Sequence, residues 1–558
     1  MQAAARAAAR RKWDAIVVGG GHNGLVAASY LAKAGKQVCV LEKRHVVGGA
    51  AVTEEIIPGF KFSRASYVFS LFRPQIIKDL DLYRHGLEVY PRNPSSFTPT
   101  LDGRSLILGS DMQASQRSIA QFSAADAEAY PKYNAMLDDM VKFFTPMIDE
   151  LPPDVRVFFS SDSSISRRID AIQSMMRLGY RTGKLGKELT TFLEFMTAPA
   201  TKILDRWFES DILKATLATD AIIGAKVSPS TPGSAYILFH HVMGEVNGVK
   251  GMWGHVKGGM GGVSHALKLA ALEAGATILT NAPVASINVQ DGRVRGVSLE
   301  DGETYEADCV VSNANPAMTM LDLVDEKELP ESVVTHFKKN WNCESSSTKI
   351  NVALDRLPNF SCLPNSGDGK TPMPHHRGTT HFEDCLEQIE EAYIDVKRGY
   401  ASKRPVIEMN VPTSLDSSIA PPGKHIALLF VQYTPYEPKD GGWHIPGKKE
   451  KFADQVFSVI EQYAPGFKSS IIGYDMLTPP DLERIFSLPR GNIFHGAMGL
   501  DQLFWMRPMP GYSDYRSPIK GLYMGSAGTH PGGGVMGAPG RNVAMVCLKD
   551  MKYANVSK

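Results

Sequence analysis

Cysteine is scarce in this sequence and is nowhere arranged as a redox or metal-binding motif. The six cysteines are scattered over 558 residues, and none forms a C-x-x-C pair or a spacing typical of metal ligands. The pattern indicates a reducing compartment with isolated thiols, and it gives no reason to expect a bound metal ion. His240 and His241 have no third ligand at a usable spacing, so we interpret them as packing residues.

Long apolar runs and an excess of one charge are missing as well. No run approaches the ~20 apolar residues that a transmembrane helix needs, so no membrane span is predicted. The 60 basic and 59 acidic residues give a net charge of +1, which offers no electrostatic argument for nucleic acid, and no nucleic-acid motif is present. With 43% hydrophobic and 21% charged residues, the composition is that of a globular protein, and the length predicts more than one domain.

Acidic residues are absent from the first twelve positions. This segment, MQAAARAAARRK, holds six alanines and four basic residues. The composition is typical of a short mitochondrial targeting helix. A disordered basic tail is the alternative, because the segment is short and contains no serine. Both interpretations of residues 1–12 stay open, and the first predicts a mitochondrial protein.

A glycine cluster follows the first predicted strand. Residues 13–18, WDAIVV, are expected to form a buried strand, and Gly19 to Gly24 then fit the pattern G-x-G-x-x-G. The next segment, LVAASYLAKAG, has the apolar spacing of a helix, and QVCVLEK predicts a second strand that ends at Glu42. Strand, turn, helix, strand and acid in this order predict a dinucleotide-binding site.

Each part of this motif has a mechanical role. Gly19 permits the tight turn, Gly21 lets backbone approach a pyrophosphate, and Gly24 allows the helix to pack closely on the strand. The helix N-terminus offers free N–H groups to the phosphate. Glu42, 18 residues after Gly24, can accept hydrogen bonds from an adenosine ribose.

The residues after the second strand favour FAD over NAD. A plain NAD domain would continue with another helix and strand, but here the doublet Gly48-Gly49 leads into the turn-rich segment PGFKFSRASYVFS. This favours a flavoprotein in which the loop supports the pyrophosphate. We therefore expect Asn23, Lys43, Gly48 and Gly49 to contact FAD.

Residues 95–249 change to apolar patterns with helical spacing. Ser123 is expected to cap a helix that carries Tyr133, Leu137, Met140 and Phe144 on one face. Such a stripe fits core packing, and it also fits the wall of a channel for an apolar substrate. Both interpretations stay open.

Alternating patterns dominate the next two hundred residues. A helix over 262–274 and the strand ATILT precede three short strands with turns at Asp291-Gly292 and Asp301-Gly302. The strand CVVSNA is apolar enough to rejoin a buried sheet. Further strands, TKINVAL, PVIEMNV and HIALLFVQY, and a helix near 449–464 predict a second domain around a mixed sheet. The expected division is a discontinuous FAD-binding domain over 13–94, 250–345 and 481–558, and a substrate domain over 95–249 and 346–480.

A second glycine-rich stretch lies near the C-terminus. Residues 521–540, GLYMGSAGTHPGGGVMGAPG, contain eight glycines. Glycine is costly to order, so the cluster indicates backbone that turns sharply or approaches another group closely. An apolar strand precedes the cluster and a helix, RNVAMVCLKDM, follows it. An ordinary glycine-rich surface loop is the alternative.

Five stretches in this order resemble the phytoene desaturase and carotenoid isomerase branch of the FAD-dependent oxidoreductases. They are VVGGGHNGLVAA, VLEKRHVVGG, GGMGGVSHAL, VVSNANP and GLYMGSAGTHPGGGVMGAPG, and the resemblance covers nearly the whole chain. It implies an α/β fold, in which a Rossmann-like FAD-binding domain of the GR2/amine-oxidase type carries an inserted α+β substrate domain. It also implies a mitochondrial location, in the matrix or on the matrix side of the inner membrane, and a poorly defined activity.

The resemblance also places the terminal glycine stretch beside the flavin. A strand end would approach the cofactor there, and the glycines at 532–534 would open the N-terminus of the last helix. On the adenine side, a backbone contact from Val284 is implied. The cofactor contacts that the resemblance adds are Val284, Gly525, Gly533, Gly534, Val535 and Met536.

Two departures limit what the resemblance implies. Amine-oxidase relatives have arginine after the glycine doublet, where this chain has Ala50, so an amine substrate is less expected. A disulfide reductase needs a second strand–G-x-G-x-x-G–helix unit and two cysteines close together in sequence. The sequence contains neither, so we do not expect disulfide reductase activity.

The leading hypothesis is an FAD-dependent oxidoreductase that moves hydride between an apolar, isoprenoid-like substrate and flavin, with oxygen or a quinone as acceptor. The alternatives are a flavin-fold regulator of mitochondrial function that acts through a protein partner, and an amine oxidase. Peripheral contact with a membrane is compatible with each. No catalytic residue is assigned, since His530 and Arg507 near the terminal loop fit structural roles.

Overall fold

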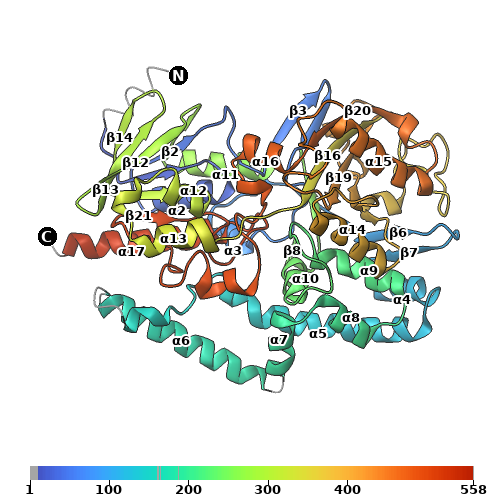
Figure 1. Ribbon diagram of the computed structural model, residues 1–558, viewed down its shortest axis with the longest axis horizontal. Helices are drawn as coiled ribbons and strands as arrows, with labels where there is room; N and C mark the ends of the chain where they lie inside the picture. Colours follow the sequence, from blue (N-terminus) through green and yellow to red (C-terminus); the bar gives the residue numbers. More distant parts are fainter. Residues whose placement is uncertain (1–10, 160–162, 164, 187, 557–558) are drawn as a thin grey trace.

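The computed structural model describes residues 11–159, 163, 165–186 and 188–556. Two sheet-centred parts lie side by side, and a layer of helices runs beneath them in the view of Figure 1. One part holds a parallel sheet and both ends of the described chain, and the other holds a seven-stranded sheet. The targeting segment predicted for residues 1–12 falls almost wholly outside the described residues.

The first part is built on a five-stranded sheet in the order β11-β2-β1-β15-β21, in which every neighbouring pair is parallel. All strands except β11 are wholly buried, as expected where helices cover a parallel sheet. The order confirms the predicted Rossmann-like α/β fold. The strands are β1 Ala15–Val18, β2 Val38–Glu42, β11 Thr277–Thr280, β15 Val310–Ser312 and β21 Leu522–Met524.

Three helices cover this sheet, and they meet at glycines. They are α2 (His22–Lys33), α11 (Gly261–Glu273) and α17 (Ala538–Val556), and α2 packs against both others. A Cβ atom on Gly24 would lie 2.1 Å from the carbonyl oxygen of Gly19, and one on Gly540 would lie 2.1 Å from that of Asn23. Backbone therefore approaches backbone on two sides of the first turn of α2.

A small antiparallel sheet lies between β11 and β15 in the chain. It consists of β12 Val284–Gln290, β13 Arg293–Leu299 and β14 Thr304–Glu306. Asp291 and Gly292 both have positive φ, at 53° and 65°, which suits a tight hairpin turn. The three strands and this turn confirm the sequence prediction.

The second part is built on a seven-stranded sheet in the order β20-β16-β19-β18-β17-β6-β7. All pairs are antiparallel except β17 with β6, which makes the sheet mixed, as predicted. Helix α15 (Lys448–Tyr463) buries its apolar face on this sheet. Helix α14 (Leu386–Arg398) contacts strand β18 of the same sheet. The strands are β6 Ser96–Pro99, β7 Ser105–Leu108, β16 Ser347–Leu354, β17 Thr379–His381, β18 Val406–Asn410, β19 His425–Gln432 and β20 Ile471–Leu477.

The helical layer is formed largely by residues 112–242. Ser123 caps α5 as predicted, since its Oγ accepts a hydrogen bond from the Asp126 amide at 3.0 Å. The apolar stripe of α5 is buried in a core that it shares with the neighbouring helices. No helix of the described chain is long and apolar enough to span a membrane. The helices are α4 Met112–Ala120, α5 Ala124–Ile148, α6 Ile165–Leu185, α7 Glu188–Thr197, α8 Ala200–Trp207, α9 Asp211–Ala218 and α10 Ser234–Val242.

Short elements connect the two parts. Hairpin β3–β4 (Thr53–Ile57 and Phe60–Ser63) leaves the first part and packs Phe60 and Phe62 against Ile426 and Leu428 of the second sheet. The strands of the parallel sheet all fall within 13–94, 250–345 and 481–558. The remaining elements are α3 Pro74–Asp79, β5 Val89–Pro91, β8 Glu245–Val246, β9 Val249–Lys250, β10 Gly254–Val256, α12 Pro316–Leu321, α13 Glu331–Thr335 and α16 Pro479–Phe486.

The glycine contact between α2 and α17 leads to a stability prediction. Gly540→Ala should lower the melting temperature by several degrees, because its Cβ would overlap the Asn23 carbonyl and overpacking costs about 1–3 kcal/mol. The control is Gly179→Ala in α6, where nothing lies within 4 Å of the new Cβ. The control should be neutral or stabilising by up to about 1 kcal/mol. Equal melting temperatures for both variants in a thermal scan would contradict the close contact.

Candidate functional site

A cavity of about 720 Å³ joins the two parts of the molecule. It runs from the glycine motif of the parallel sheet to the strands of the seven-stranded sheet, and its volume is in the range of ligand-binding sites. Nine predicted cofactor residues line it: Gly19, Gly21, Asn23, Glu42, Lys43, Gly49, Val284, Gly534 and Val535.

The amino end of α2 forms the dinucleotide cradle. Gly19 has a φ of +93°, which gives the sharp turn off β1. Gly21 is the N-cap of α2 and supplies no side chain, and the first turn holds no acidic residue. The first N–H groups of the helix are therefore free to bind an anionic phosphate. Gly24 lies beneath this turn, in the helix–strand packing role that the motif predicts.

Glu42 holds this cradle together from the end of β2. Its Oε2 accepts a hydrogen bond from the Gly20 amide and its Oε1 accepts one from the Arg44 amide, each at 2.8 Å. The carboxylate lines the cavity although its residue is only 6% exposed. Burial raises the pKa of Glu42, and the two amides and nearby cations partly offset that effect. The acid thus orders the glycine loop as well as facing the cavity.

The glycine doublet fixes the loop that faces this cradle. The Gly48 amide donates to the Gly20 carbonyl at 2.8 Å, and a Cβ on Gly48 would lie 2.7 Å from Ser264 Oγ. Gly48 therefore lies behind the cavity wall, whereas Gly49 and Ala50 line the cavity.

The C-terminal glycine stretch forms the opposite wall of the same end. Gly534 and Val535 line the cavity, and both have positive φ, at 112° and 55°. Such a φ is a strained conformation for a β-branched residue, and strain of this kind gathers at functional sites. The sequence stretch is therefore not an ordinary surface turn.

Three other predicted residues of this stretch lie behind the wall. A Cβ on Gly533 would lie 2.6 Å from the Phe494 ring, and one on Gly525 would lie 2.6 Å from Val543 of α17. Met536 is 1% exposed and belongs to the helical core. Their places indicate that they support the wall rather than form its surface.

Arg507 and His530 order this wall, in the structural roles expected for them. Arg507 is fully buried, and its guanidinium donates to the carbonyl oxygens of five residues: Phe494, Gly496, Ala497, Gln502 and Ala527. Burial lowers the pKa of Arg507 to about 10. His530 Nε2 donates to the Met147 carbonyl at 2.8 Å. These bonds fix the loops on which the terminal glycines rest.

His240 and His241 pack in the protein interior, as predicted. His240 Nε2 donates to the Gly533 carbonyl at 3.0 Å, and His241 Nδ1 lies 3.0 Å from the Asp220 carbonyl. Burial lowers the pKa of His240 to about 3 and that of His241 to about 4, so both rings are neutral at physiological pH. Within the described residues, no three metal-ligating side chains gather.

The far end of the cavity lies in the second part of the molecule. Tyr130, Tyr133, Leu137 and Val141 of α5 form an apolar wall there. The α5 stripe thus serves both as core and as cavity wall, which confirms core packing, while its use for an apolar substrate stays a prediction. Lys349 of β16 also lines this end, and burial lowers the pKa of its amine well below the usual range.

Several lining residues were missed by sequence reasoning. Asn313 stands in the quoted stretch VVSNANP, and its amide nitrogen donates to the Gly19 carbonyl at 3.3 Å. That motif could have identified Asn313. Tyr67, Arg92 and Glu408 also line the cavity, but each comes from a segment with no recognisable motif.

Comparison with known proteins identifies the dinucleotide. Residues 24–358 match the family described as flavin containing amine oxidoreductase. A mouse protein, pyridine nucleotide-disulfide oxidoreductase domain-containing protein 2, is 50% identical over 561 residues, covering 99% of this chain and 96% of its own. The chain belongs to the flavin-containing amine oxidoreductase family. Its dinucleotide is therefore FAD.

More distant relatives confirm the resemblance to carotenoid enzymes. A limonene dehydrogenase polypeptide of Castellaniella defragrans is 28% identical, covering 97% of this chain and 95% of its own. A lycopene-forming phytoene desaturase of Pseudescherichia vulneris is 26% identical, covering 96% and 99%. The solved structure of putrescine oxidase bound to putrescine superposes with a TM-score of 0.59 at 16% identity, over 97% of this chain and 99% of its own. That likeness establishes the shared fold.

The residues present fit FAD. The uncapped N-terminus of α2 suits a pyrophosphate, and Glu42 at the end of β2 suits a ribose hydroxyl. Gly534 and Val535 line the other side of the cavity, and Gly534 brings no side chain to it. FAD supplies hydride and electron transfer when bound. The residues described above would hold the cofactor.

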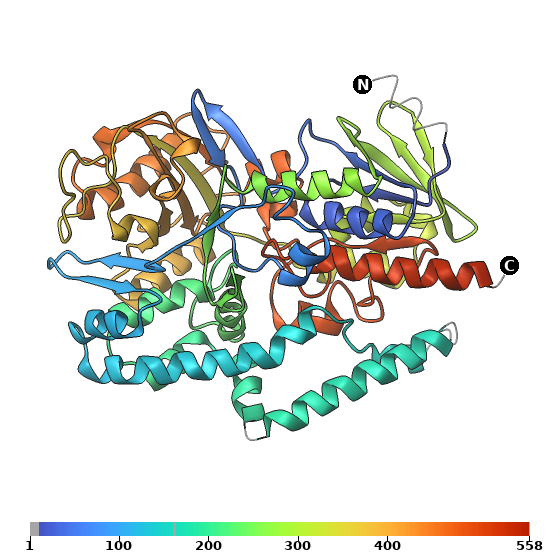
Figure 2. The same ribbon diagram turned by 180° about the vertical axis from the view of Figure 1, so that it is seen from behind.

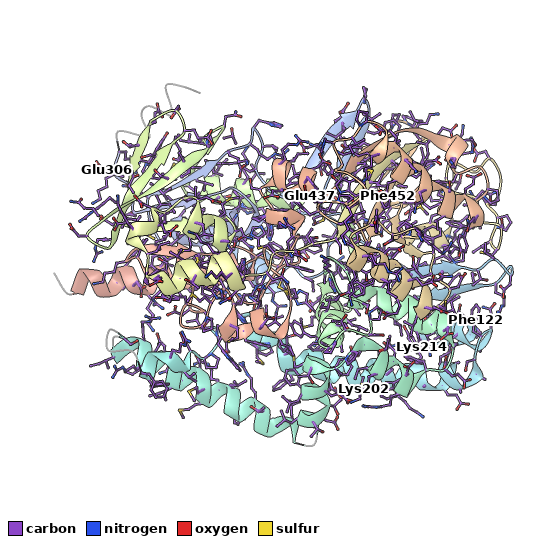
Figure 3. The ribbon with its side chains drawn as sticks, viewed as in Figure 1. Phe122, Lys202, Lys214, Glu306, Glu437 and Phe452 are labelled. Carbon is purple, nitrogen blue, oxygen red and sulfur yellow. The ribbon has the colours of Figure 1, made fainter. Side chains whose placement is uncertain are left out.

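The Glu42 hydrogen bonds predict an effect on cofactor affinity. Glu42→Ala should weaken FAD binding roughly tenfold to a hundredfold, because a hydrogen bond to a charged group contributes about 1.5–3 kcal/mol. The dissociation constant would be measured by reconstituting apoprotein. Glu306→Ala is the control, since Glu306 lies on the edge strand of the small sheet, at the outer side of the molecule in Figure 3, and is not among the residues that line the cavity. An unchanged dissociation constant for Glu42→Ala would remove Glu42 from the site.

Proposed function

We propose that the protein is a mitochondrial FAD-dependent oxidoreductase that moves hydride between an apolar, isoprenoid-like substrate and flavin. Electrons leave the flavin to oxygen or a quinone. The observation that supports this proposal is the single cavity that joins the FAD cradle to the apolar wall of α5. A substrate along that wall would share one cavity with the bound flavin, which is what direct hydride transfer requires.

The wall suits an apolar substrate. Leu137, Val141, Leu238 and Phe430 line it, and burying each CH2 group contributes ~0.8 kcal/mol. Two relatives carry names that refer to limonene and phytoene, and both names fit an apolar substrate. Ala50 stands on the cavity where amine-oxidase relatives have arginine, so amine oxidation stays the less favoured alternative.

Disulfide reduction is not part of the proposed activity. All six cysteines are free thiols, and none of them lines the cavity. Cys309 and Cys547 are both buried, and burial raises the pKa of Cys547 well above its usual range. A thiol in that state is a poor nucleophile and a poor electron carrier.

The redox proposal predicts a visible change in the bound flavin. Purified holoprotein titrated without oxygen with a reduced terpene donor should lose its flavin absorbance. Readmission of oxygen, or addition of a soluble quinone, should restore it. The measurement is the visible spectrum during the titration. A flavin that stays oxidised with every terpene and amine donor would contradict the proposal and favour the regulatory alternative, in which the fold serves a mitochondrial protein partner.

The proposed location is the mitochondrial matrix or the matrix side of the inner membrane. The alanine-rich, basic composition of residues 1–12 supports it. Peripheral membrane contact belongs to the same proposal, because an apolar substrate dissolves in the bilayer.

Helix α6 supplies the surface for that contact, since its apolar face points outward. On the opposite face, Arg167 forms an ion pair with Asp514 and Arg181 forms one with Glu150, each at an N–O distance of 2.7 Å. An ordinary surface helix has the reverse arrangement, and a large exposed apolar patch marks an interaction site. The helix lies along the outer edge of the molecule (Figures 1 and 2). Its outward residues expose between 46% and 78% of their surface: Ile165, Ile169, Ile172, Met176 and Tyr180.

This face predicts binding to lipid vesicles. The wild type should co-sediment with vesicles of phosphatidylcholine and an anionic phospholipid, and Met176→Glu should weaken that binding about tenfold or more, since burying a methionine contributes about 1.5–3 kcal/mol. Gln173→Glu is the matched control, because it adds the same charge to an exposed site of α6. Absent vesicle binding, or a soluble dimer that Met176→Glu dissociates, would contradict the membrane assignment.

A further inference from the structure

The far end of the cavity is not wholly apolar. Five titratable side chains line it, each from a different segment of the chain. We call them the polar cluster, and they are Tyr67, Arg92, Asp220, His381 and Glu408. Each of Arg92, His381 and Glu408 is no more than 8% exposed, so the cluster is built into the protein interior.

Arg92 is only partly satisfied by the protein. Its Nη1 donates to Thr379 Oγ1 at 2.6 Å and to Asn410 Oδ1, both neutral groups. Its Nε is buried without a partner, and its Nη2 makes no hydrogen bond within the described chain. Arg92 also forms no ion pair with any described carboxylate. A buried guanidinium in this state has hydrogen bonds left for a ligand.

The two acids are also incompletely paired. Glu408 accepts one hydrogen bond from the Tyr67 hydroxyl at 2.9 Å, and the Asp220 carboxylate has no hydrogen-bond partner among the described residues. Burial raises the pKa of each to about 7. The nearby Glu408 carboxylate raises the pKa of Asp220 further, whereas the Tyr67 hydrogen bond partly offsets the rise at Glu408, and Arg92 opposes the rise at both acids. His381 is neutral, because burial and Arg92 lower its pKa to about 3.

This set of groups disfavours ionised ligands of either sign. The Arg92 guanidinium offsets the attraction of the two acids for an ammonium group, and the two acids offset the attraction of Arg92 for a carboxylate. A hydroxyl group can donate to a carboxylate and accept from Arg92 at the same time. Burying such unpaired donors and acceptors against a pure hydrocarbon would leave them unsatisfied, which costs free energy.

We propose that the polar cluster binds a neutral, oxygen-bearing head group, in the first instance an alcohol, so that the substrate is an amphipathic molecule rather than a hydrocarbon. The apolar body lies along α5, where Tyr133, Leu137 and Val141 line the cavity. The cluster positions the substrate and takes no part in hydride transfer. This inference rests on the proposed function and narrows its substrate class.

The test uses four probes that share one carbon skeleton: geraniol, geranylamine, geranic acid and the hydrocarbon myrcene. Binding to oxidised holoprotein would be followed by the visible difference spectrum of bound FAD and by the melting temperature. Neither readout requires turnover, so a failed redox assay and a failed binding assay are distinguishable. Geraniol should bind at least about tenfold more tightly than each of the other three.

Substitutions then assign the preference to the cluster. Asp220→Asn should weaken the binding of geraniol about tenfold and leave the binding of myrcene unchanged. Asp138→Asn is the matched control, an exposed acid of α5 on the same cavity, and it should change neither probe. Glu408→Gln, which can still accept from Tyr67, is the second variant if Asp220→Asn does not fold. Tightest binding of myrcene, the amine or the acid, binding of no probe, or equal effects of Asp220→Asn and Asp138→Asn would overturn the proposal.

Discussion

The first turn of α2 packs closely between two backbone segments, and the geometry of the site depends on this packing. On one side Gly24 meets the carbonyl of Gly19, and on the other Gly540 meets the carbonyl of Asn23. Because these are contacts of backbone with backbone, they fix the spacing of β1, α2 and α17 more tightly than side-chain packing could. The free N–H groups of α2 and the cavity-facing residues Gly534 and Val535 are thereby held on one cavity, although they lie some five hundred residues apart in sequence.

Local order explains what could be predicted from sequence. The unit from β1 to Glu42, the hairpin at Asp291-Gly292 and the Ser123 cap are each determined within about thirty residues, where turn chemistry and apolar period act directly. The polar cluster was not predictable in this way. Arg92, Asp220 and Glu408 come from distant segments, and only the assembled sheets and helices bring them to one cavity.

Apolar periodicity identifies a face of a helix but not the direction in which that face points. The α5 stripe packs into the core and lines the cavity at once, whereas the α6 stripe points away from the molecule. Both helices have the same kind of spacing in sequence. The two helices differ in their other face, since α6 directs Arg167 inward to Asp514, whereas the buried residues of α5 are mostly apolar. The apolar pattern alone therefore does not show which face of a helix packs inward.

The interleaving of the chain has a consequence for how the holoprotein is made. The ribosome synthesises the G-x-G-x-x-G unit some five hundred residues before Gly534 and Val535, which lie between β21 and α17. Until then the parallel sheet lacks its edge strand β21, and α2 lacks its packing partner α17. A nascent chain therefore presents half of a nucleotide site with an open apolar flank. Both walls of the nucleotide site are present only after Gly534 and Val535 have been synthesised, so binding of the flavin between the two walls has to follow the folding of that segment.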